Sequence, residues 1–265
     1  MEQVYLFLVY ALLGATSGVL AGLLGVGGGI ILVPVLVLSL EFQGVSPAIS
    51  MHMALGTSLA IIVITAMASV RAHHRRGAVI WSIVWRITPG ILLGTFFGSG
   101  LANHLSGTTL KRLFGLFALA LAFYLAFGRP PLASRTLPRT VGMALVGGII
   151  GCISALMGIG GGSLSVPFMV WCNVSMRQAV ATSAAIGWPI AIAGATGYTL
   201  TGWGDARLPS MALGYVHLPA MIAVALTSAT CAPLGARLAH SIDPLSLRRL
   251  FAALLLLLGG RMLMA

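Results

Sequence analysis

Long apolar stretches recur from one end of this sequence to the other. Hydrophobic residues make up 58% of the chain and charged residues only 7%. A soluble domain of that composition has too few polar side chains to cover its surface. Only short polar segments separate the apolar stretches, and no polar domain lies between them. The pattern predicts an integral membrane protein whose functional residues lie within the bilayer or in short loops.

The charged residues and the cysteines exclude other classes of protein. The formal net charge is +11, and the basic residues cluster at the ends of apolar stretches. This placement is typical of the positive-inside rule and does not indicate nucleic-acid binding. Cys152, Cys172 and Cys231 have no CxxC or CxxH spacing. We therefore expect the cysteines to be packing residues, with no metal site and no cofactor.

The chain divides into two similar halves. In the first half the apolar spans lie near 4–24, 30–40, 47–70, 79–102 and 109–127. In the second half they lie near 141–157, 163–172, 177–200, 211–238 and 245–264. We expect one membrane domain, with a first repeat over 1–127, a cytoplasmic linker over 128–140 and a second repeat over 141–265.

Matching motifs in the same order indicate an internal duplication. GVGGGIILVP at 25–34 aligns with GIGGGSLSVP at 158–167. Thr57-Ser58 follows the first motif as Thr182-Ser183 follows the second, and LKRLF at 110–114 aligns with LRRLF at 247–251.

The number of spans and the charges predict opposite orientations for the two halves. Each half holds an odd number of spans, so the second half enters the membrane from the other side. If RAHHRRG at 71–77 is cytoplasmic, the linker, Arg177 and the segment flanked by Arg237 and Arg248 are cytoplasmic too. The sequence thus predicts an all-α polytopic membrane protein with two inverted five-element repeats. We expect about 8–10 transmembrane or re-entrant helices, with paired broken helix hairpins.

The glycine-rich segments predict where those hairpins break. The spans at 30–40 and 163–172 are too short to cross a hydrocarbon core of about 30 Å. Non-helical backbone is tolerated at membrane depth only where it lines a cavity or is buried in protein. Short, interrupted segments at matching places in two halves indicate a transporter's binding site.

Backbone N–H groups at such breaks suit an anion, and glycine lets them approach it closely. The glycines that we expect to bind the substrate are Gly25, Gly27, Gly28, Gly29, Gly158, Gly160, Gly161 and Gly162. The hydroxyl donors that we expect beside them are Thr57, Ser58, Ser163, Ser165, Thr182 and Ser183. Pro34 and Pro167 have structural roles in this hypothesis. The alternative is that each GxGGG segment only lets two helices cross closely.

These motifs resemble the TauE/SafE family of sulfite exporter-like transporters. The likeness rests on GLLGVGGGIILVP, ALMGIGGGSLSVP, ALGTSLA, VATSAAI and GYVHLPAMIAV. The last is similar to the family's GYxNLPA pattern, with His217 where asparagine is usual. The resemblance covers essentially the whole chain. It implies transport of sulfite, organosulfonates such as sulfoacetate, or other small sulfur-containing anions across the cytoplasmic (inner) membrane.

A few polar side chains within the spans are further candidates. Arg86 falls inside a span, where it is expected to bind the anion. The alternative is an arginine that snorkels to the interface or bonds backbone carbonyls. His52 and His217 are candidate proton carriers, and His217 also a substrate donor, with packed histidines as the alternative. Trp188 either walls the pocket or packs against neighbours. All four carboxylates fall at termini or loops, which disfavours a cationic substrate.

Alternating-access transport of a small anion is the function that this pattern favours. An anion channel is the nearest alternative, because polar breaks can also line a pore. The only features that favour a copper-handling protein are Met51-His52-Met53 and the 12 methionines. No motif indicates an enzyme. The coupling ion, proton or sodium, and the oligomeric state stay open, with a homodimer as one candidate.

Overall fold

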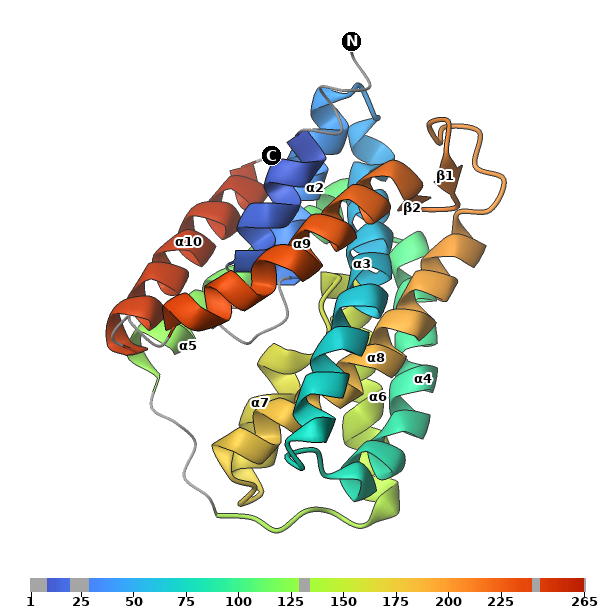
Figure 1. Cartoon of the computed structure of the whole chain (residues 1–265). Helices are drawn as coiled ribbons and strands as arrows, with labels where there is room; N and C mark the ends of the chain where they lie inside the picture. Colours follow the sequence, from blue (N-terminus) through green and yellow to red (C-terminus); the bar gives the residue numbers. More distant parts are fainter. Residues whose placement is uncertain (1–8, 20–28, 129–133, 240–243, 265) are drawn as a thin grey trace.

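The computed structural model describes residues 9–19, 29–128, 134–239 and 244–264. These residues form a bundle of helices with one short β hairpin (Figure 1). The first half holds a helix over Val9–Val19, α2 (Gly29–Phe42), α3 (Pro47–Arg75), α4 (Trp81–Asn103) and α5 (Gly107–Phe127). The second half holds α6 (Thr140–Met157), α7 (Gly162–Trp171), α8 (Met176–Thr201), β1 (Ala212–Leu213), β2 (Val216–His217), α9 (Leu218–Ala239) and α10 (Pro244–Met264).

The helices fall where the apolar spans predict them, except at residues 211–217. That part of the span expected at 211–238 forms the β hairpin, so the prediction of one continuous helix there is wrong. Gly214, with φ 55°, turns the chain so that Ala212 pairs with His217 and Leu213 with Val216. Helix α9 starts only after this hairpin, at Leu218.

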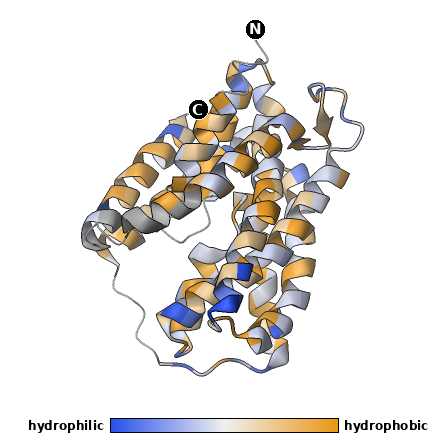
Figure 2. Ribbon diagram, in the orientation of Figure 1, coloured by the Kyte–Doolittle hydropathy of each residue, from blue (hydrophilic) through white to orange (hydrophobic). Residues whose placement is uncertain are grey.

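Length and composition identify a multi-pass membrane protein. Helices α3, α5, α6 and α8 are long and apolar enough to cross a membrane. Figure 2 shows apolar residues along most of the bundle. Large apolar side chains such as Leu93, Phe97 and Leu145 are exposed on its surface, where lipid would cover them. The described residues therefore confirm the all-α membrane class.

Helices α2 and α7 are short, as predicted. They contain 14 and 10 residues. Each contains a proline as its sixth residue, Pro34 in α2 and Pro167 in α7. Because proline removes a hydrogen-bond donor and fixes φ, both helices carry the same local constraint soon after they begin.

Small residues bring the main helix pairs close together. Helix α4 packs along α6, and a Cβ at Gly90 or Gly94 would collide with the backbone of Ala144 or Gly148. Helix α3 packs on α8, and α5 on α10. Gly14 of the Val9–Val19 helix allows a similar close approach to Val224 and Thr227 of α9. Backbone contact of this kind is how helices associate in membranes.

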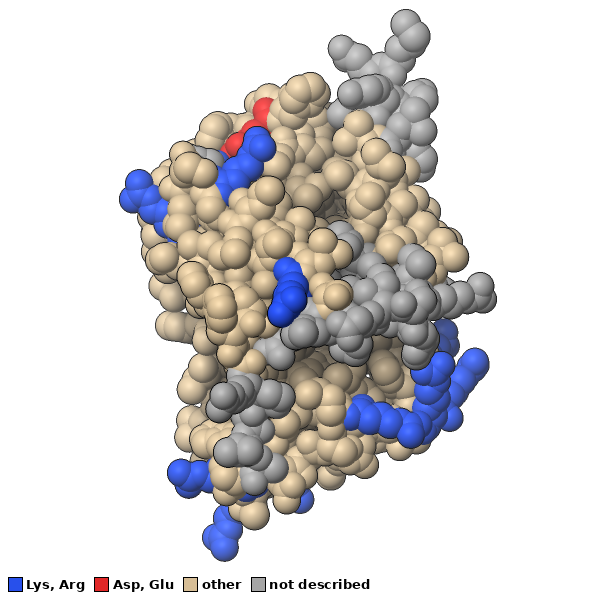
Figure 3. All heavy atoms as spheres, turned by 90° about the vertical axis from the view of Figure 1, so that its left-hand side faces the viewer, with Lys and Arg blue, Asp and Glu red and all other residues tan. Residues whose placement is uncertain are grey.

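The two ends of the bundle differ in charge. We call the end with the β hairpin, where α3 and α5 begin, the hairpin end, and the opposite end, where α3 finishes and α6 and α8 begin, the basic end. In Figure 3 most of the Lys and Arg side chains gather in the lower half, towards the basic end, whereas the acidic atoms in view lie near the top.

A buried ion pair closes one side of the hairpin end. Lys111 Nζ of α5 lies 2.6 Å from Glu41 Oε1 of α2, with 5% and 25% of the two side chains exposed. Ser50 of α3 donates a further hydrogen bond to the same oxygen, at 2.7 Å. The prediction that placed Glu41 in a loop is wrong, because Glu41 lies in the last turn of α2.

Candidate functional site

The second glycine segment breaks the chain between α6 and α7. Gly158 ends α6 with φ 63°, and Gly161 precedes α7 with φ 74°. Both residues are in the left-handed region, which costs other L-residues about 1–2 kcal/mol. The first turn of α7 closes when the N–H groups of Leu164 and Ser165 donate to the Gly161 carbonyl. The N–H groups of Gly162 and Ser163 precede this turn and have no acceptor within the helix.

Three other elements converge on this break. A Cβ at Gly29, where α2 begins, would lie 2.8 Å from the Gly158 carbonyl oxygen. Ser58 Oγ of α3 donates to that same oxygen at 2.8 Å. Gly187 of α8 lies against Gly160. The last glycine of the first motif thus meets the first glycine of the second, while Gly25, Gly27 and Gly28 lie outside the described residues.

Apolar side chains close the break in this conformation. A Cβ at Gly158 would meet Val33 and Leu55, and one at Gly161 would meet Ile190. Gly158, Ile159 and Gly161 are buried, whereas Gly160, Gly162 and Ser163 are half-buried. The close-packing interpretation of the motif therefore describes part of what the glycines do.

Ser154 is a polar residue at the break that sequence reasoning missed. Its Oγ lies 3.4 Å from the position that a Cβ would take at Gly161. Ser154 is fully buried, and its hydroxyl has no hydrogen-bond partner among the described residues. An isolated serine in an apolar helix gives no sequence signal. Only the fold places it beside a glycine that lies in the next segment of the chain.

Five of the six predicted hydroxyl groups have hydrogen-bond partners within the protein, and Ser163 is the exception among the described residues. Thr57 Oγ1 accepts from the His217 backbone N–H at 2.9 Å, and Thr182 Oγ1 accepts from the Ile80 N–H at 3.0 Å. Ser165 Oγ donates to Ser183 Oγ at 2.8 Å. These bonds join segments far apart in the sequence, so the hydroxyls hold the bundle together around the break.

Arg86 and Trp188 have exposed side chains, and Trp188 directly follows Gly187, which lies against the break. Arg86 is exposed on α4, beside Trp85, which is 70% exposed. This position agrees with the snorkelling alternative and not with burial inside the span, because α4 begins at Trp81 and Arg86 lies near the start of that helix, within reach of the interface.

The two candidate histidines are buried at the hairpin end. His217 Nδ1 lies 3.4 Å from the Tyr10 hydroxyl, which accepts a hydrogen bond from Gln43 Nε2 at 2.6 Å. His52 Nε2 lies 3.0 Å from the Ala102 carbonyl oxygen, and its ring packs on Tyr215. Met51 and Met53, on either side of His52, belong to the hydrophobic core.

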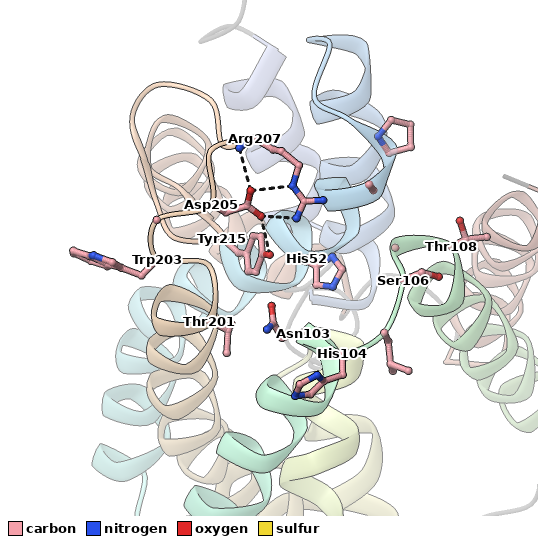
Figure 4. Close-up of a pocket in the computed structure, with 15 residues that line it drawn as sticks. His52, Asn103, His104, Ser106, Thr108, Thr201, Trp203, Asp205, Arg207 and Tyr215 are labelled. Carbon is pink, nitrogen blue, oxygen red and sulfur yellow. Dashed lines mark hydrogen bonds and ion pairs between the residues drawn. The ribbon is translucent and has the colours of Figure 1, made fainter.

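A cavity of about 840 Å³ opens at the hairpin end. Figure 4 shows it between the N-terminal turns of α3 and α5, the end of α4 and the β-hairpin segment. We call it the hairpin-end cavity. Asp205 binds Arg207 there through three hydrogen bonds, 3.0 Å from the backbone N–H, 2.9 Å from Nε and 2.6 Å from one terminal guanidinium nitrogen.

The two members of this ion pair shift each other's pKa. The hydrogen bonds from Arg207 hold the pKa of the Asp205 carboxyl well below its usual range, and the carboxylate raises the pKa of Arg207 in turn. Tyr215 donates to Asp205 Oδ2 at 3.1 Å, and burial raises the pKa of its hydroxyl. The sequence identifies Asp205 only as a loop charge. The long segment between α8 and α9 is the signal that could have indicated a structured site there.

The fold and the break define a class of protein, a polytopic α-helical membrane transporter. The chain belongs to the sulfite exporter TauE/SafE family, whose model matches residues 10–262. The resemblance that the glycine motifs indicated is thereby confirmed.

Relatives of similar length carry the same general description. A probable membrane transporter protein of Haemophilus influenzae is 34% identical over 256 residues, which cover 96% of this chain and 97% of the relative. A probable membrane transporter protein of Methanocaldococcus jannaschii is 29% identical over 270 residues, or 99% and 97% of the two chains. No solved structure matches the chain.

Proposed function

We propose that this protein is a secondary transporter that moves small sulfur-containing anions, such as sulfite or sulfoacetate, across the cytoplasmic membrane by alternating access. The observation that carries the proposal is the break between α6 and α7. It combines two left-handed glycines, the N–H groups at the start of α7 that have no acceptor within the helix, and the hydroxyl of Ser154, which has no partner among the described residues. Such a set offers donors and no fixed negative charge, which suits an anion.

The substrate's binding site in this proposal is the meeting point of the two glycine segments. Gly29 lies against Gly158, and both segments lead into short helices with a proline at the same position. When Val33, Leu55 and Ile190 move apart, the donors at the break become accessible to the anion. The hydroxyls of Thr57 and Thr182 act as positioning groups around it.

We propose further that the two halves are inverted repeats. The two threonine bonds support this. Thr57 of the first half holds the N–H of His217, directly before α9 of the second half. Thr182 of the second half holds the N–H of Ile80, directly before α4 of the first half. The packing of α4 on α6 is likewise matched by that of α9 on the Val9–Val19 helix.

The orientation and the coupling belong to the same proposal. By the positive-inside rule, the basic end faces the cytoplasm and the hairpin end faces outward. A proton carried through His217 or His52, or a sodium ion bound at the break, would couple transport to an ion gradient. A homodimer is the assembly that we propose to test by mass measurement in detergent.

Flux into proteoliposomes tests the proposal. We expect saturable uptake of sulfite or sulfoacetate that accelerates when the same anion is present on the opposite side. Imposed pH and sodium gradients identify the coupling ion. Saturation without acceleration, together with rapid uncoupled flux, would identify an anion channel.

Variants at the break connect the flux to the site. Gly161→Ala should abolish most uptake, because the added Cβ would lie 2.5 Å from Ile190 Cδ1, in addition to the strain at φ 74°. Ser154→Ala should raise the KM by removing one donor. Gly44→Ala is the matched control, since Gly44 has φ 82° but no atom within 4 Å of an added Cβ. Equal uptake by Gly161→Ala and Gly44→Ala would contradict the site.

A further inference from the structure

The hairpin-end cavity is separate from the break and has its own set of polar groups. Two histidines line it, His52 and His104. His52 lies near the start of α3, whereas Ser58, further along the same helix, binds the break. Arg207 and Trp203 come from the segment between α8 and α9. Its volume of about 840 Å³ exceeds what a small sulfonate needs.

The carboxylate in this cavity does not repel an anion as a free one would. Both oxygens of Asp205 already accept hydrogen bonds, Oδ1 from the N–H and Nε of Arg207, Oδ2 from its guanidinium and from Tyr215. Its charge is balanced by the bound arginine.

Arg207 retains donors for a further partner. A guanidinium carries five N–H bonds, of which two are used by Asp205. Tyr215 also interacts with the guanidinium, and 57% of the Arg207 side chain is exposed. In Figure 4 the guanidinium lies on the side of the cavity facing α3, with His52 below it. Asp205 therefore fixes the arginine while leaving one edge of its fork open, the geometry that binds oxyanions in pairs of hydrogen bonds.

The start of α5 adds donors to the same cavity. Ser106 caps the helix by accepting from Thr109 N, and Gly107 and Thr108 follow it. Their N–H groups have no acceptor within the helix, and the helix dipole makes this end favourable for negative charge. Gly107 is close to Pro47 at the start of α3, so the two helix starts lie side by side.

His52 forms part of the wall of the cavity and does not itself offer a donor to an anion. The residue is 5% exposed and lines the cavity, and one ring nitrogen is bonded to Ala102. The other, Nδ1, is buried without a partner in the part of the chain that the structure describes. Because Nε2 donates to the Ala102 carbonyl, Nδ1 of the neutral ring is an acceptor, so the partner that it lacks is a donor such as water and not the anion.

We propose that the hairpin-end cavity is a second anion site, where Arg207 and the first turn of α5 capture the sulfur oxyanion before it reaches the break. This inference rests on the proposed function for the identity of the anion. The cavity lies at the end that we orient outward, so it serves exchange with that side of the membrane.

The first measurement is binding to the purified full chain in detergent. Trp203 is 69% exposed and lines the cavity, so its fluorescence should change as sulfoacetate is added. Trp203→Phe should remove that signal. Arg207→Gln should weaken the binding about tenfold, as loss of a charge-assisted pair of hydrogen bonds requires, and Arg207→Lys should weaken it less. Arg112→Gln, at an exposed arginine of the same end that does not line the cavity, should bind as the parent protein does.

The second measurement is the KM for sulfoacetate supplied on each side of oriented proteoliposomes. Arg207→Gln should raise the KM about tenfold from the hairpin side and leave the KM from the basic side unchanged. Circular dichroism and gel filtration establish that each variant is folded. If Arg207→Gln does not fold, Arg207→Lys takes its place in the measurement.

The outcomes separate this inference from the proposed function. Unchanged binding and unchanged KM in folded Arg207→Gln would overturn the cavity site while transport stands. Arg207-dependent binding in a protein that carries no sulfur anion would overturn the proposed function and retain the anion site.

Discussion

The chain segments that precede α4 and α9 are held in the same way but differ in length. Gly77 and Gly214, with φ 62° and 55°, turn the chain three residues before Ile80 and His217. A threonine of the opposite half then binds the N–H of each of those residues. The connection before α4 spans only 76–80, whereas the one before α9 spans 202–217 and forms the β hairpin.

The same difference recurs at the helix that carries each threonine. Helix α3 begins at Pro47, ahead of Thr57, and α8 begins at Met176, ahead of Thr182. Helix α3 therefore has about one more turn before its threonine. That turn, residues 47–50, contains Pro47 and Ala48, which line the hairpin-end cavity. The parts that surround the break are matched between the halves, and the additions at the hairpin end build a cavity with no counterpart in the short connection.

The largest expected effect is a loss of uptake when glycines of the break are replaced, and it tests whether the two glycine motifs are equivalent. Gly158→Ala places a Cβ at φ 63° against Val33 and the backbone of Leu55. Left-handed strain of about 1–2 kcal/mol, added to this contact, should lower uptake by at least about tenfold. Gly25 is the aligned residue of the other motif. If the halves are equivalent, Gly25→Ala lowers uptake similarly, and normal uptake by that variant would break the comparison.

The next effect concerns the ion pair that only the first half has. The residue of the second motif that aligns with Glu41 is Val174, so Lys111 and Glu41 form an interaction without a copy. Lys111→Met leaves Glu41 unpaired and should lower stability by about 2–3 kcal/mol. This is less than the roughly 3–5 kcal/mol of a fully buried pair, because Glu41 is partly exposed and keeps the bond from Ser50.

Thermal unfolding in lipid nanodiscs measures this loss. Arg112→Met is the matched control, one residue along α5 and exposed. Equal midpoints for Lys111→Met and Arg112→Met would show that the pair does not hold α2 to α5.

A smaller loss of stability is expected when either of the two threonines is replaced, and the two losses can be compared directly. Thr57→Val and Thr182→Val keep the shape of the side chain but leave the N–H of His217 or Ile80 without its acceptor. Each should lose about 1–2 kcal/mol, and the two losses should be alike. Thr57→Ser and Thr182→Ser retain the hydroxyl and should recover most of the stability. A loss confined to one threonine would show that the two halves are held differently.

The sequence predicts the helices and the break well because both depend on local features. Apolar length sets the spans, and the run Gly158 to Gly162 cannot continue a helix. It does not decide between the alternatives for Arg86, since position along a span does not say which face a side chain occupies. It also fails to predict that Thr57 binds His217, because that contact joins residues of opposite halves. Ser154 and Arg207 have unremarkable neighbours in the sequence, and only the packing of α6 and the hairpin segment gives them a role.

The smallest expected effect is a change of protonation at the hairpin end. Asp205 has a pKa held below its usual range by Arg207, so its carboxylate stays ionised as the pH falls from 7 to 5. The stability that the pair contributes is present above the ordinary pKa of about 4, and it is lost only as the pH falls through the lower pKa of the folded protein. Arg207→Gln removes the main cause, so the pKa of Asp205 should return toward about 4.

Trp203 lines the same cavity, and the difference between the parent fluorescence and that of Trp203→Phe measures the titration. We expect no step between pH 5 and 3.5 in the parent, and a step near pH 4 after Arg207→Gln. Arg112→Gln should titrate as the parent does, because this arginine does not contact Asp205. A step near pH 4 in the parent would show that Asp205 is free. The hairpin end would then present a negative charge to an approaching anion, and its difference from the basic end would oppose capture instead of favouring it.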